Sequence, residues 1–203
     1  ETHNVGVGEN ALGGPIAGGE YNVAVGSNTL DALTSGDNNT AVGYQAGTAV
    51  TTGGYNTFLG WEAGKTYTGT GDVNTAIGAS ALQAMTTGTQ NTALGGNAGY
   101  SLTSAGDCVL IGHNAGDAIT IGSQNVAVGQ NALGAAVVER RNVAIGNNAL
   151  AAHRTTASTV NDTGNTSVGF YAGAQITTGG GNTAIGQNAL ATRLTTGSNN
   201  VGI

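Results

Sequence analysis

Four aspartates are the first candidates for chemistry, because paired carboxylates can hydrolyse glycosidic bonds. Asp37, Asp72, Asp107 and Asp162 each lie one to three residues before a recurring position that is usually asparagine. Asp37 and Asp72 have the same spacing two repeats apart, which predicts about 10 Å between them across two strand spacings. This exceeds the separation of about 6.5–9.5 Å in inverting glycosidases. Aspartates also bond the local backbone in turns, and we favour that role.

The histidines and the single cysteine form no pattern that is typical of a reactive site. His3, His113 and His153 fall at different positions of different repeats, which argues against a metal triad. Cys108 takes the place of asparagine in one repeat, where a small half-buried side chain fits. No Gly-Lys-Ser/Thr follows a glycine-rich stretch, as a phosphate loop would require. We therefore predict no catalytic residues, no metal site, no cofactor and no enzymatic activity.

The composition excludes several classes of protein. The chain has 203 residues, of which 37 are glycine and only 8% are charged, with a net charge of −6. Five cationic side chains are too few for a nucleic-acid-binding surface. One cysteine excludes an intrachain disulfide framework. No apolar run approaches the roughly 20 residues of a membrane span.

A five-residue motif repeats along the whole chain. It reads asparagine, threonine or valine, a small residue, an aliphatic residue and glycine, as in Asn22-Val23-Ala24-Val25-Gly26. The intervals between copies are 17 or 18 residues, except for 23 residues between Asn142 and Asn165. Ala, followed by Leu or Gly, comes three residues after nearly every motif glycine. The copies begin at residues 4, 22, 39, 56, 74, 91, 108, 125, 142, 165, 182 and 200.

The period predicts an all-β parallel solenoid of about twelve coils. A 17-residue unit is too short for the helical repeat families, whereas it accommodates short strands and glycine-rich turns. Strands stacked about 4.8 Å apart give a rod of about 55 Å. We expect residues 1–203 to be one repeat domain and a piece of a longer fibre, because the pattern is cut at both ends.

Alternation along the strand divides the motif between two faces. The fourth residue is always Val, Leu or Ile, so we expect it in the interior. The third is usually small, so we expect it on a face that another chain approaches closely, at the axis of a homotrimer. The alanines of this set are Ala24, Ala41, Ala76, Ala93, Ala127, Ala144 and Ala184.

The first motif residue predicts a ladder of amide side chains, because identical amides in stacked coils bond one another. The members are Asn22, Asn39, Asn56, Asn74, Asn91, Asn125, Asn142, Asn165 and Asn182.

The motif Asn-(Thr/Val)-Ala-(Val/Ile/Leu)-Gly-x-x-Ala resembles the β-roll head repeats of trimeric autotransporter adhesins and the related repeats of bacteriophage tail fibres. The resemblance covers practically the whole chain. It implies a left-handed β-roll, three chains around one axis, a place outside the cell or on a virion, and attachment to a cell-surface receptor or glycan. No stalk, neck or membrane anchor is visible in the sequence.

Aromatic residues crowd into two adjoining repeats and mark a candidate ligand site. Tyr44 and Trp61 directly follow successive motif glycines, which predicts that they stack one coil apart. Tyr55 precedes Asn56, and Glu62 and Lys65 follow the tryptophan. Exposed rings suit the C–H face of a sugar, and the two charged groups can reach hydroxyls. The alternative is that the rings stabilise the shaft. The long interval also predicts an exposed loop within residues 151–164.

Three functions fit these observations. We expect an extracellular trimeric fibre segment that serves extension and attachment. A purely structural filament or spacer is the alternative. An ice-binding solenoid is less favoured, because the second motif residue alternates between threonine and valine and gives no unbroken threonine column.

Overall fold

Residues 3–70, 73–155, 161–192 and 196–203 are described by the computed structural model. These residues contain fourteen strands and no helix. Twelve strands coincide with the repeated motif, and two lie beside the longest interval. The strands are β1 (Val5–Val7), β2 (Val23–Val25), β3 (Thr40–Val42), β4 (Thr57–Leu59), β5 (Thr75–Ile77), β6 (Thr92–Leu94), β7 (Val109–Ile111), β8 (Val126–Val128), β9 (Glu139–Arg140), β10 (Val143–Ile145), β11 (Asn161–Asp162), β12 (Thr166–Val168), β13 (Thr183–Ile185) and β14 (Val201–Gly202).

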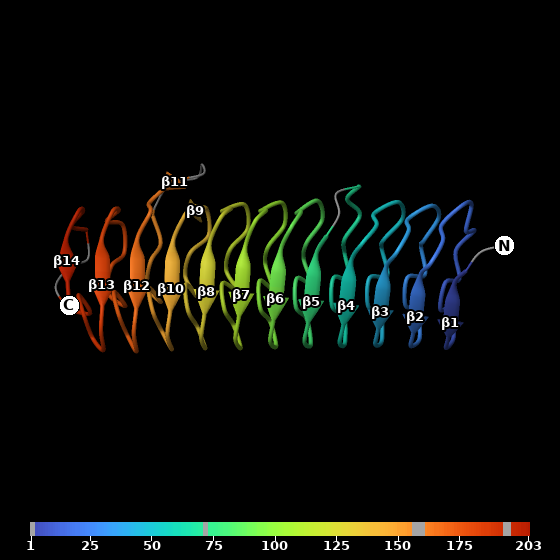
Figure 1. The fold of residues 1–203 in the computed structure, drawn as a ribbon, viewed down its shortest axis with the longest axis horizontal. Coiled ribbons are helices and arrows are strands. Elements are labelled where there is room, and N and C mark those ends of the chain that lie inside the picture. Colours follow the sequence, from blue (N-terminus) through green and yellow to red (C-terminus); the bar gives the residue numbers. More distant parts are fainter. Residues whose placement is uncertain (1–2, 71–72, 156–160, 193–195) are drawn as a thin grey trace.

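The motif strands form one parallel sheet that runs the length of a solenoid. Their order in the sheet follows the chain, except that β9 and β11 form a separate two-stranded pair. Each motif residue pairs with its counterpart in the next coil, for example Ala24 with Ala41. Figure 1 shows this row of strands, with the N-terminus and the C-terminus at opposite ends of the rod. The predicted parallel β-solenoid is therefore confirmed.

The third motif residue, not the fourth, points into the solenoid. Ala24, Ala41 and Ala76 are fully buried, whereas the second and fourth residues of their strands retain solvent exposure. The expected interior position of the fourth residue is therefore wrong, as is the placement of these alanines on an axis between chains. Because the coil is short, little space separates the strand from the segment that faces it. A small residue such as alanine fits in this space beside the buried side chains of the facing segment.

Three further columns complete the core. The first is the alanine three residues after the motif glycine, and the second is the leucine or glycine that follows it. The third is a larger apolar residue farther along, such as Leu33, Val50 or Leu102. Leu30 and Leu82, in the second column, are buried with φ of 48° and 50°. The backbone at this position is left-handed, which favours glycine and makes leucine unusual.

The motif glycine is required by the spacing of the coils. Gly43 has φ of +131°, a conformation that L side chains rarely adopt. A Cβ built there would lie 2.7 Å from the carbonyl carbon of Gly60 in the next coil. Because the backbones meet so closely, any side chain at this position would push two coils apart.

The motif asparagines form a buried ladder from coil to coil, in two runs on either side of Cys108. The Asn39 N–H donates to Asn22 Oδ1 at 2.9 Å, and Asn39 Nδ2 donates to the same oxygen at 3.1 Å. Asn39 Nδ2 also donates to the Gly53 carbonyl at 2.9 Å. Each amide therefore joins the strand of its own coil to the preceding coil and to a turn. Buried polar groups of the backbone are satisfied in this way without charge.

Cys108 interrupts the ladder. Asn91 Oδ1 accepts the Cys108 N–H at 3.1 Å, and the thiol lies 3.5 Å from the carbonyls of Gly106 and Gly122. The next asparagine, Asn125, directs Nδ2 to the Gly122 and Glu139 carbonyls. Its N–H faces the Cys108 sulfur, a weaker acceptor than the amide oxygen that the asparagines of the other coils supply.

Cys108→Asn is expected to stabilise the protein by about 1–3 kcal/mol. The new amide would accept the Asn125 N–H and donate to Asn91 Oδ1 and the Gly122 carbonyl, and each net hydrogen bond contributes about 0.5–1.5 kcal/mol. Chemical unfolding followed by circular dichroism measures the change. Cys108→Ala is the control, since it also removes the thiol and adds no amide. An asparagine variant no more stable than the alanine variant would contradict this account.

The long interval forms an addition beside the sheet. Strand β11 pairs in parallel with β9 of the preceding coil, and Asn161 lies opposite Glu139. Arg141 and Asp162 form an exposed ion pair. Residues 156–160, the middle of the loop expected from the sequence, lie outside the described residues.

Candidate functional site

The three aromatic side chains predicted to bind a ligand lie on the surface. Tyr44, Tyr55 and Trp61 are 46%, 61% and 52% exposed. Tyr44 and Trp61 follow the ends of β3 and β4, whereas Tyr55 precedes β4 and so lies at its opposite end. The sequence predicts stacking of Tyr44 on Trp61, but the structure gives no ring contact between them, although both are described. The two other aromatic side chains of these coils, Phe58 and Tyr67, are buried and meet edge to face at 6.1 Å.

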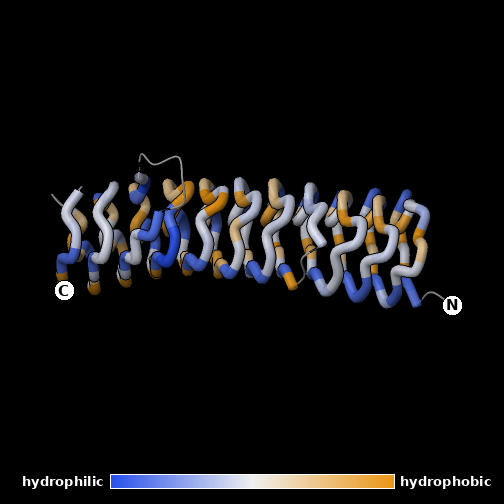
Figure 2. The backbone as a smooth tube through the Cα atoms, turned by 90° about the horizontal axis from the view of Figure 1, so that it is seen from above, coloured by the Kyte–Doolittle hydropathy of each residue, from blue (hydrophilic) through white to orange (hydrophobic). Residues whose placement is uncertain are grey.

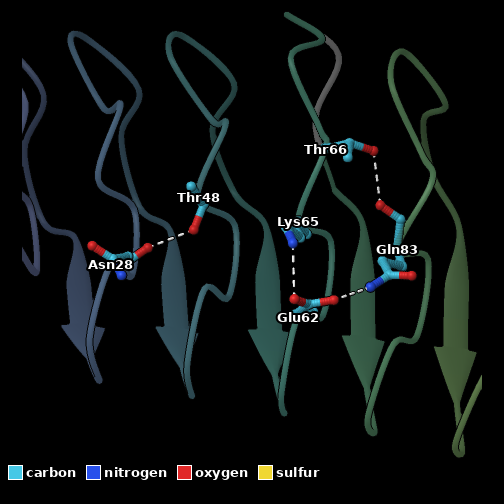
Figure 3. A network of polar contacts seen from close by, with 6 residues as sticks. All are labelled: Asn28, Thr48, Glu62, Lys65, Thr66 and Gln83. Carbon is cyan, nitrogen blue, oxygen red and sulfur yellow. Dashed lines mark hydrogen bonds and ion pairs between the residues drawn. The ribbon is translucent and has the colours of Figure 1, made fainter.

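Glu62 and Lys65 bond each other. Lys65 Nζ donates to Glu62 Oε1 at 2.8 Å, and Gln83 of the next coil donates to the other carboxylate oxygen. Figure 3 shows these contacts, with Thr66 Oγ1 donating to the Gln83 carbonyl at 2.7 Å. Glu62 is only 8% exposed, so its carboxylate links two coils rather than facing solvent, whereas the Lys65 side chain is 34% exposed. The structure thus joins Glu62 with Lys65 and leaves the three rings as separate exposed groups.

An outward-facing line of aliphatic side chains was not foreseen. We call the fourth motif residues the aliphatic stripe. They lie on the outer face of the twelve-stranded sheet, where Leu59, Leu94 and Ile185 are 43–44% exposed. Figure 2 shows the hydropathy pattern repeating from coil to coil. The full set is Val7, Val25, Val42, Leu59, Ile77, Leu94, Ile111, Val128, Ile145, Val168, Ile185 and Ile203.

A second asparagine column lies two residues after the motif glycine. Asn97 Nδ2 donates to Asn114 Oδ1 at 3.1 Å, and Asn10 bonds Asn28 in the same way at 3.0 Å. Asn97 and Asn114 have φ of 56° and 57°, which asparagine tolerates better than most residues. The recurrent Asn-Ala pair in the sequence was the signal for this column.

A column of threonines, which the repeated motif did not predict, runs along six coils. It contains Thr34, Thr51, Thr68, Thr86, Thr103 and Thr120, one in each of six successive coils. Thr34 Oγ1 donates to the Thr51 carbonyl at 3.0 Å, and Thr86, Thr103 and Thr120 make the equivalent bond. These four hydroxyls donate their protons to the next coil, so they stabilise the stack. Because the protons are already used within the protein, the column gives little support to the ice-binding alternative.

Two buried ionisable residues lie beside the long interval. The carboxylate of Glu139 accepts the N–H groups of Val137 and Val138 at 2.6 and 3.0 Å, and the Thr155 hydroxyl at 2.8 Å. Burial opposes ionisation, but the hydrogen bonds from Thr155 and Val137 outweigh it and lower the pKa of Glu139. Burial lowers the pKa of His153, which keeps this ring neutral in the core. The contacts of Glu139 and His153 are thus with neighbouring backbone and polar side chains of the solenoid.

Neither the Cys108 thiol nor any cluster of metal-ligating side chains among the described residues forms a reactive centre. Burial raises the pKa of the Cys108 thiol to about 11, so the thiolate that a nucleophile requires is scarce at neutral pH. Within the described ranges, no three His, Cys, Asp or Glu side chains gather as metal ligands. Nor does that part of the chain contain a helix able to cross a membrane.

Comparison of the chain with protein-family models, with curated proteins and with solved structures finds no match.

Proposed function

We propose that this chain is a segment of an extracellular fibre, on a cell surface or a virion, whose copies associate side by side through the aliphatic stripe and serve extension and attachment. The observation that carries the proposal is the stripe itself. Soluble monomers rarely expose contiguous apolar patches larger than a few hundred Å². This stripe follows a twelve-stranded sheet along the rod, and its members include Val7, Leu94 and Ile145, each 39–57% exposed.

The geometry of the stripe favours copies that run alongside one another. Every coil contributes one aliphatic side chain at the same register, so a second rod aligned with the first covers the stripe over its full length. The outer face also carries the second motif residues, threonine or valine, and no charged side chain. We propose three copies, the number that the resemblance to adhesin heads and tail fibres implies. Tyr44, Tyr55 and Trp61 are exposed groups with which such a fibre could contact a receptor.

The mass of the protein in solution tests this proposal. Sedimentation equilibrium is expected to give three times the chain mass of 19.7 kDa. Leu94→Lys with Ile145→Lys places two charges on the stripe, and we expect this variant to be monomeric because burying unpaired charges is costly. Thr87→Lys with Ser104→Lys adds the same charges at exposed turns elsewhere and should leave the mass unchanged. A wild-type protein that stays monomeric at high concentration would overturn the proposal.

A further inference from the structure

A pocket of about 380 Å³ lies on the surface between two successive coils, well separated in sequence from the exposed rings. It is lined by Asn97, Tyr100, Asn114 and Asp117. The two asparagines belong to the second asparagine column, and Tyr100 and Asp117 occupy equivalent positions three residues later in each coil. The volume is at the lower end of the range for small-molecule sites, about 300–1,000 Å³.

The polar groups of this pocket retain hydrogen-bonding capacity. The bond from Asn97 Nδ2 to Asn114 Oδ1 fixes both amides and leaves Asn97 Oδ1 as an acceptor and Asn114 Nδ2 as a donor. Among the described residues, neither of these two atoms has a hydrogen-bond partner, and the same holds for the Tyr100 hydroxyl. The pocket therefore offers one amide acceptor and one amide donor, on two side chains that the bond between them holds in place.

Asp117 supplies a carboxylate that burial partly removes from water. Desolvation raises the pKa of Asp117, while backbone N–H groups and the nearby His113 oppose that change. Its counterpart in the following coil is Gly134, where a Cβ would lie 3.6 Å from Asp117 Oδ1. The absence of a side chain at Gly134 keeps this side of the carboxylate uncovered. Tyr100 is 43% exposed and contributes an aromatic ring beside these groups.

We propose that this pocket binds one pyranose ring of a saccharide, an inference that rests on the proposed attachment function and gives it a site. A sugar presents several hydroxyls, each both a donor and an acceptor, which can bond the free Oδ1 of Asn97 and the free Nδ2 of Asn114. The Asp117 carboxylate accepts further hydroxyl protons, and a charge-assisted hydrogen bond is stronger than a neutral one. The Tyr100 ring packs against the C–H face of the sugar. The small volume and the single ring favour one sugar unit.

Saturation-transfer NMR with methyl glycosides of glucose, galactose, mannose and N-acetylglucosamine tests this site. We expect transfer from the wild-type protein to at least one of the four. Asp117→Ala and Tyr100→Ala are expected to weaken that binding at least tenfold. Asp31→Ala is the matched control, because Asp31 occupies the same position in a distant coil and does not line the pocket. Circular dichroism of each variant checks that its fold is retained.

Other outcomes overturn the proposal. These are no transfer to any of the four glycosides, or transfer that Asp117→Ala and Tyr100→Ala leave unchanged. Trp61→Ala adds a discriminating arm: loss of binding in this variant alone would place the saccharide on the exposed rings instead. All four lining residues belong to one chain, so a monomeric protein can still bind the sugar. Failure of self-association is thereby distinguished from failure of this site.

Discussion

Asn74→Ala is expected to destabilise the protein by about 3–5 kcal/mol. The variant loses the bonds from Asn74 Nδ2 to Asn56 Oδ1 and to the Gly88 carbonyl, both 3.1 Å. It also leaves the Asn91 N–H, which donates to Asn74 Oδ1 at 3.1 Å, without its acceptor in a buried position. Each buried polar group that loses its partner costs about 1–3 kcal/mol. Guanidinium unfolding followed by circular dichroism measures the loss.

Asn147→Ala is the control for this substitution. Asn147 Nδ2 donates to Gln130 Oε1 of the preceding coil at 3.2 Å in a bond exposed to solvent, and Asn147 Oδ1 accepts a partly buried bond from Asn148 Nδ2. The Asn147→Ala variant is expected to lose less than about 1 kcal/mol, because water can replace the lost partner of each bond. Equal losses in the two variants would show that the buried ladder contributes nothing beyond ordinary surface contacts.

The order of the coils could be predicted because a fixed period places equivalent residues at the same point of each successive coil. Once Asn22, Asn39 and Asn56 are seen to recur at equal intervals, stacking places them in one column. The parallel register follows, since only that register pairs each motif residue with its own counterpart. The ladder of amides needs no further information.

The inner and outer faces could not be predicted in the same way. Side chains alternate along a strand, so Ala41 and Val42 must point to opposite faces. The alternation does not determine which of the two faces is the interior. Hydrophobicity favoured the valine, whereas the volume available within a short coil selects the alanine. Likewise, Tyr55 and Tyr67 have the same residue type and opposite environments, because the turn that holds Tyr55 faces solvent and the coil wall that holds Tyr67 faces the core.

Gly64→Leu is expected to destabilise the protein by at least about 3 kcal/mol, and Phe58→Ala is expected to restore part of that loss. Phe58 is the one aromatic third motif residue, and its ring occupies the space beside Gly47 and Gly64. A Cβ on Gly47 would lie 2.8 Å from the ring, and one on Gly64 would lie closer still. Overpacking of a core typically costs about 1–3 kcal/mol, and the left-handed backbone adds about 1–2 kcal/mol for a non-glycine residue.

The double variant reproduces an arrangement that other coils already contain. Leu133 and Leu150 occupy this position in two later coils, and there the strand residues are Ala127 and Ala144. Phe58→Ala alone should cost about 3–5 kcal/mol by opening a cavity. In the double variant the new leucine fills that cavity, so we expect it to be more stable than either single variant.

Leu110 is a second case in which a large third motif residue occupies the space beside two glycines. Its side chain lies against Gly99 and Gly116, where a Cβ would in each case be 2.7 Å from a leucine methyl carbon. Gly116→Leu should therefore also be rescued by Leu110→Ala. Contacting residues that share one space show interaction energies of about 0.5–3 kcal/mol in a double-mutant cycle. Additive losses in both cycles would mean that the strand residue and the turn residue do not compete for the same volume, and that glycine is retained in this column for its backbone conformation alone.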